Sequence, residues 1–65
     1  MSTYEAREFL VSKGYPKRIK AYGEEFKLNG IQMLADNDFE AIYGDSLLVC
    51  LEDIRNYPNV YEVIE

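Results

Sequence analysis

The sequence predicts an α+β fold in which one N-terminal helix, or two, packs on a small antiparallel β-meander. The clearest helical signal, a capping box followed by apolar residues at helical spacing, lies in the first fourteen residues. From residue 24 onward, turn-forming residues recur at short intervals, and the tail from Val60 to Ile64 is rich in β-branched and aromatic residues. The 65 residues are expected to form a single small domain, residues 1–65.

The first helix is predicted to lie between Ser2 and Gly14. Ser2 and Glu5, three residues apart, form a capping box, in which the two residues satisfy free N–H groups of the first turn. The side chains that follow have helical spacing: Tyr4, Ala6, Phe9, Leu10 and Lys13. Gly14 predicts the end of this helix.

A second helix can begin at Pro16, because proline is tolerated in the first turn of a helix. Ile19 and Tyr22 would lie on one side of it. Gly23 would end it.

The next segment predicts a β-hairpin that turns at Asn29-Gly30. Phe26, Leu28, Ile31 and Met33 alternate with polar residues on either side of this pair, which suits a two-residue type I′ turn. Such a turn pairs Leu28 with Ile31 and places the flanking apolar side chains on one buried face.

The remaining residues predict a second hairpin and a last strand. Residues 39–43 and 46–51 would pair across Gly44-Asp45. Residues 52–55 fit a helical turn between strands, and residues 60–64 fit a terminal strand.

An all-helical alternative also accounts for residues 24–64. Asp36 or Asn37 can cap a helix bearing Phe39 and Ile42, and Ser46 can cap another. In this form the chain resembles a sterile alpha motif domain over residues 8–54, through Phe9-Leu10, Gly14-Tyr15, Tyr22, Phe26, Asn29-Gly30, Leu34, Asp38-Phe39 and Ile42. The resemblance implies five helices and head-to-tail assembly. The chain departs from the family in a short stretch before Asp38 and in having Val49-Cys50 where a glycine is expected.

Charge is distributed unevenly along the chain, whose net charge is -5. Residues 1–20 carry five basic and two acidic side chains, whereas residues 21–65 carry two basic and ten acidic ones. The acidic part would repel phosphates and attract basic protein surfaces. A solvated surface that keeps a small protein in solution is the alternative interpretation.

The composition argues against catalysis and against metal binding. The chain has no histidine and one cysteine, Cys50, which excludes nucleophiles activated by histidine and the usual zinc ligand sets. The acidic run Asp36-Asn37-Asp38 begins like a calcium loop but lacks the later glycine and glutamate. We therefore expect no enzymatic activity and no cofactor. With no signal peptide, no apolar span and no disulfide, a cytoplasmic location away from membranes is expected.

The function predicted is that of a small acidic protein-binding module that docks on a basic surface of another protein. An inhibitor of a nucleic-acid-handling protein, encoded by a phage or mobile element, is its most specific form. The expected docking face carries six carboxylates and one tyrosine: Glu24, Glu25, Asp36, Asp38, Glu40, Asp45 and Tyr43. The tyrosine would serve as a half-exposed anchor, or would instead fill the edge of a small core.

Two other functions remain open at this point. A homo-oligomeric assembly unit could join through an exposed terminal strand. Nucleic acid could contact Lys17, Arg18 and Lys20, but the acidic remainder of the chain makes this partner the less favoured one.

Overall fold

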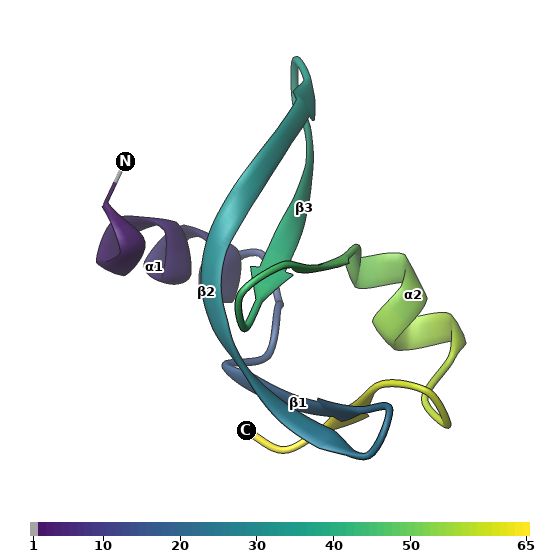
Figure 1. The fold of residues 1–65 in the computed structure, drawn as a ribbon. Coiled ribbons are helices and arrows are strands. Elements are labelled where there is room, and N and C mark those ends of the chain that lie inside the picture. Colours follow the sequence, from purple (N-terminus) through teal and green to yellow (C-terminus); the bar gives the residue numbers. More distant parts are fainter. Residues whose placement is uncertain (1) are drawn as a thin grey trace.

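One helix packs on a five-stranded antiparallel sheet, and a second, short helix lies between the last two strands (Figure 1). The computed structural model describes residues 2–65. The elements are α1 (Thr3–Ser12), β1 (Arg18–Ala21), β2 (Glu24–Ala35), β3 (Asp38–Tyr43), β4 (Leu47–Val49), α2 (Leu51–Asn56) and β5 (Glu62–Val63). The predicted α+β class is confirmed, and the all-helical alternative with its likeness to a sterile alpha motif domain is wrong.

The N-terminal helix forms as the sequence predicts. The Ser2 hydroxyl accepts the Glu5 N–H at 3.1 Å and donates to the Glu5 carboxylate at 3.2 Å, which supplies the N-terminal cap of α1. At the other end, Gly14 has a φ of 102°, a left-handed conformation that ends the helix at little cost. Ala6 and Leu10 are the buried residues of α1, which packs against β2.

The second helix predicted from Pro16 is wrong, because this segment is strand β1. Ile19 and Ala21 are buried while Lys20 between them is exposed, which is the two-residue period of a strand. Tyr22 and Gly23, with φ values of 54° and 78°, then form a tight turn into β2. The two-residue turn with positive φ values that was predicted at Asn29-Gly30 is thus found at Tyr22-Gly23, before β2.

The predicted hairpin at Asn29-Gly30 is also wrong. These two residues lie inside β2, which runs without a turn from Glu24 to Ala35. Leu28 pairs with Tyr43 and Gly30 pairs with Ile42, so the extra residue between them forms a β-bulge. The bulge shifts the alternation by one residue and lets Leu28 and Ile31 face the core from one strand, which is the pattern that the hairpin prediction had explained by a turn.

The later elements agree with the sequence prediction in type and order, but the predicted strand 46–51 is shorter, because Leu51 begins α2. β3 and β4 form the second hairpin, with Tyr43 paired to Leu47 across the turn at residues 44–46. The helical turn between strands is α2. The terminal strand is β5, whose ladder with β1 continues to the last residues, where the Ile64 N–H donates to the Arg18 carbonyl at 3.0 Å.

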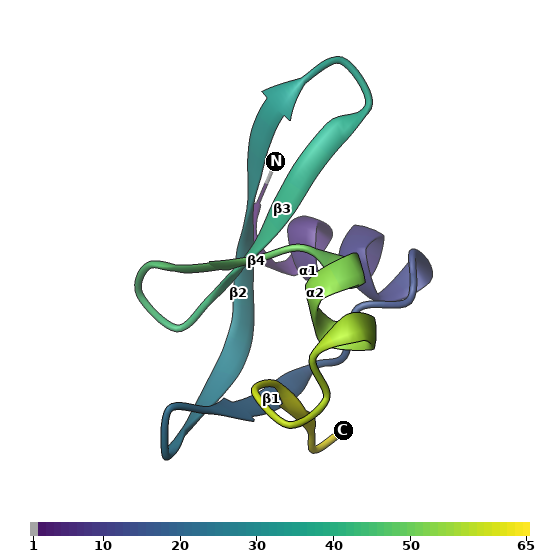
Figure 2. The same cartoon turned by 90° about the vertical axis from the view of Figure 1, so that its right-hand side faces the viewer.

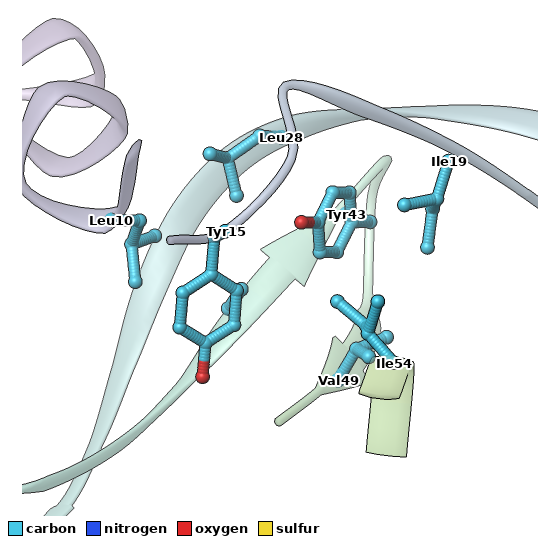
Figure 3. Close-up of a cluster of buried hydrophobic side chains, with 8 residues drawn as sticks. Leu10, Tyr15, Ile19, Leu28, Tyr43, Val49 and Ile54 are labelled. Atoms are coloured by element: carbon cyan, nitrogen blue, oxygen red, sulfur yellow. The ribbon is translucent and has the colours of Figure 1, made fainter. Parts of the chain in front are cut away.

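The core lies between the curved sheet and the two helices (Figure 3). Its buried members are Leu10, Tyr15, Ile19, Leu28, Ala41, Tyr43, Val49 and Ile54. Two tyrosine hydroxyls inside it have partners: Tyr43 donates to the Pro16 carbonyl at 2.8 Å, and Tyr15 accepts the Leu51 N–H at 3.0 Å. Every buried polar side-chain atom in residues 2–65 is satisfied in this way.

The strand order is β4-β3-β2-β1-β5, and β2 is shared by two ladders. Its first residues pair with β1, and its residues from Leu28 onward pair with β3. The far end of the β2–β3 hairpin therefore leaves the core and projects from the body of the molecule (Figures 1 and 2).

Candidate functional site

The predicted acidic residues lie at separate turns of the sheet. Glu24 and Glu25 begin β2, whereas Asp36 and Asp38 flank its far end, twelve residues along the strand. Figure 1 shows these two turns at opposite ends of the molecule. Asp45 lies in a third turn, between β3 and β4. The structure therefore does not bring the predicted residues together on one face.

Tyr43 cannot contribute to a docking face, which corrects the sequence prediction. Its side chain is fully buried at the centre of the core, with 0% exposure. Burial raises the pKa of its hydroxyl well above the usual value. The residue stabilises the fold and has no surface for a partner.

Glu25 is already engaged within the chain. Its carboxylate accepts a hydrogen bond from the Arg18 guanidinium at 2.8 Å, and the same guanidinium lies 3.7 Å from the Glu65 carboxylate. Arg18 makes both ion pairs found in residues 2–65, so the other predicted carboxylates have no such partner there.

Three of the predicted residues remain together on the projecting hairpin. We call residues 31–40 the acidic arm: it contains Asp36, Asp38 and Glu40 and no basic residue. Asp36 and Asp38 are exposed and Glu40 is half-buried. The absence of basic side chains extends from residue 28 to residue 54. No lysine or arginine within residues 28–54 offsets the negative charge of the arm, and Arg55 of α2 lies across a hollow from Asp38.

Two apolar side chains on the acidic arm escaped the sequence prediction. Met33 and Leu34 are 58% and 53% exposed, beside the turn at Asp36 and Asn37. The incorrect hairpin assigned Met33 to a buried face. The signal that could have located both residues is the Asp36-Asn37-Asp38 run, because Asx residues favour a tight turn and so place their neighbours at a hairpin tip.

Aromatic contacts of Phe39, which pairs with Met33 across the arm, hold the arm against the core. The Phe39 ring lies 5.3 Å from Phe9 of α1 in an edge-to-face arrangement and 6.3 Å from Tyr15. Asn37, with a φ of 64°, takes the left-handed conformation that closes the turn at the tip. The core thus supports the arm at Phe39, and the turn at Asp36 and Asn37 lies beyond that contact.

A hollow of about 390 Å³ lies between the arm and α2. Asp38 and Phe39 form its arm side, and Cys50, Glu52 and Arg55 lie opposite. Burial raises the pKa of the Cys50 thiol, and the negative charges of Asp53 and Glu40 act in the same direction. A thiol in this state is a poor nucleophile at neutral pH.

Neither a metal site nor a membrane-spanning helix is found in the described part of the chain. In residues 2–65, no group of three or more His, Cys, Asp or Glu side chains is arranged to hold a metal ion. Over the same residues, no helix has the length and apolar character needed to cross a membrane.

The acidic arm is therefore the surface feature that best fits a role in binding. Comparisons with family models, with curated proteins and with solved structures gave no match for this chain.

Proposed function

We propose that this chain is a non-enzymatic protein-binding module whose acidic arm docks on a basic surface of another protein, such as a nucleic-acid-handling protein. The observation that carries the proposal is the exposure of Met33 and Leu34 beside two carboxylates, Asp36 and Asp38, that have no ion-pair partner in residues 2–65. Apolar anchors bordered by charge are typical of a protein interface.

The two kinds of side chain have different tasks in this proposal. Burying the exposed part of Met33 and Leu34 supplies binding free energy, on the order of 1 kcal/mol for each residue that is half exposed in the free protein. The carboxylates speed the encounter with a basic partner and reject acidic ones. Because the contact of Phe39 with Phe9 holds the arm opposite Met33, little ordering entropy is lost on binding.

Charge reversal at the arm tests the proposal. The variant Asp36→Lys with Asp38→Lys should lose capture of its partner from a lysate, because both the field and the contact at the tip are reversed. The matched control is Glu24→Lys with Asp45→Lys, which changes the net charge equally at two other exposed turns. The control should capture the same partner as the unmodified chain.

Two results would contradict the arm as the docking element. Equal loss of capture by both variants would mean that overall charge is responsible. Equal capture by both would mean that the carboxylates of the tip have no part in binding.

A homo-oligomeric assembly unit is the second candidate, and the sheet edges favour it. The edges are β4 and β5, and the apolar side chains of Leu48 on β4, Val63 on β5 and Ile64 just after β5 are exposed. Unpaired edge strands with exposed apolar side chains can pair with another chain.

A further inference from the structure

A second hollow, of about 300 Å³, lies on the outer side of α1. It is lined by Tyr4, Arg7, Glu8 and Val11, which form one stripe of the helix, and by Lys17 from the loop before β1. We call it the basic hollow. No residue of the acidic arm lines it, so the arm of the same chain does not fill it.

The basic hollow has the side chains that the acidic arm requires. Tyr4 is 71% exposed and Val11 is 37% exposed, which gives the hollow an apolar part. Arg7 and Lys17 supply two positive charges against the single negative charge of Glu8. Neither cation forms an ion pair within residues 2–65.

We propose that the basic hollow binds the acidic arm of a second copy of this chain, head to tail. Each surface presents two apolar side chains, Met33 and Leu34 on the arm and Tyr4 and Val11 in the hollow. The net charges are opposite: the arm carries three carboxylates and no cation, and the hollow carries Arg7 and Lys17 against Glu8. The inference rests on the proposed function in one respect, since both use the arm as the docking element.

The contact has two consequences for assembly. A contact in which each arm enters the hollow of the next copy is heterologous and builds chains or rings, whereas two copies that exchange arms close as a two-fold dimer. The contact is small, so the self-association is weak and depends on protein concentration and salt. Self-association also occupies the arm, and it therefore competes with a basic partner for the same residues.

Two charge-reversed variants test the proposal by light scattering over a concentration series up to about 1 mM, a range suited to a weak contact. One variant carries Asp36→Lys and Asp38→Lys in the arm; the other carries Arg7→Glu and Lys17→Glu in the hollow. At low salt the mean mass of the unmodified chain should rise above 7.6 kDa with concentration, and each variant alone should remain at that mass. An equimolar mixture of the two variants should regain the rise, because each arm then meets a hollow of opposite charge.

The controls separate this contact from the other candidates. Val63→Lys on the exposed edge β5 should leave the rise in mass unchanged, whereas edge pairing would be weakened by it. Circular dichroism checks that each variant is folded. If a reversal disrupts the fold, the neutral pair Arg7→Gln and Lys17→Gln should still lower self-association several-fold.

Three results would overturn the proposal: an unmodified chain that stays monomeric to the highest concentration, a mixture that does not regain the rise, or variants that associate as well as the unmodified chain. The hollow-reversed variant keeps an intact arm. It should therefore still capture a basic partner, so the failure of self-association and the failure of the proposed function can be told apart.

Discussion

Tyr43 is buried because its ring fills the centre of the core and its hydroxyl finds an acceptor there. The hydroxyl donates to the Pro16 carbonyl at 2.8 Å, and the side chain has no exposed surface. The sequence places Tyr43 beside Gly44 and Asp45, a setting that equally suits an exposed anchor. The acceptor comes from a residue 27 positions away, and no local pattern indicates that contact.

Replacing Tyr43 with Phe should lower the free energy of unfolding by about 1–2 kcal/mol, because it removes the hydrogen bond and leaves the Pro16 carbonyl without its partner. Urea denaturation measures the change. Tyr57→Phe, at an exposed position, is the matched control and should have little effect. Equal stabilities for the two variants would mean that the buried hydroxyl contributes nothing.

At the scale of the elements, the bulge in β2 decides the architecture. It lets a single strand run through Asn29-Gly30 and keep both Leu28 and Ile31 on the core side. The Asn29 side chain adds a contact to the neighbouring turn, where its amide donates to the Gly44 carbonyl at 2.9 Å. Asn29 is thus used for a contact between elements, and its usual role in a tight turn is not needed here.

A pair of glycine substitutions distinguishes a bulge from a turn at this position. Gly30 does not have a positive φ, and an added Cβ would make an ordinary contact with Ile42 at 3.6 Å, so Gly30→Ala should be neutral or stabilising by up to about 1 kcal/mol. Gly23, with a φ of 78°, lies in a true turn, so Gly23→Ala should cost about 1–2 kcal/mol. Urea denaturation of the two variants gives the comparison, and the opposite order of stabilities would restore the turn at Asn29-Gly30.

Several elements with local signals are predicted correctly, although the local signal at Asn29-Gly30 is not. The capping box at Ser2, the glycine at 14, the β3–β4 hairpin and the terminal strand all depend on neighbouring residues, and all are confirmed. The helix predicted from Pro16 fails for the opposite reason. Residues 18–21 form a strand because they pair with residues 24–27 and with the C-terminal strand, and the second of these pairings is long-range.

Across the whole molecule, basic and acidic residues lie on different elements, just as they lie in different parts of the sequence. The basic residues Arg7, Lys13 and Lys17 lie on α1 and in the loop after it, while the acidic residues of the arm lie at the far end of the β2–β3 hairpin. The separation of basic from acidic residues could therefore be predicted from the sequence. The grouping of the carboxylates could not, because it depends on where β2 turns, and the sequence prediction placed that turn seven residues too early in the chain.

Stability should decline in alkaline solution. Burial raises the pKa of Tyr15 and Tyr43, and the neighbouring Tyr22 hydroxyl, followed by burial, raises the pKa of Tyr61 to about 12. The folded chain then holds these protons more tightly than the unfolded chain, whose tyrosines titrate near pH 10, so stability is complete below about pH 10 and falls as the pH rises toward 12.

Urea midpoints measured from about pH 8 to pH 12 should fall above pH 10. The fall should be smaller in Tyr43→Phe, because one of the raised groups is then absent. A midpoint that stays constant over this range would contradict the link between tyrosine ionisation and stability.

Because the tip of the arm projects beyond the core, the length of the arm can change without a change in core packing. Side chains along a strand alternate between two faces, so adding two residues to each strand at the tip would leave every interior side chain where it is. The body of the molecule can thus serve as a constant platform for projections of different length, each suited to a binding surface at a different depth.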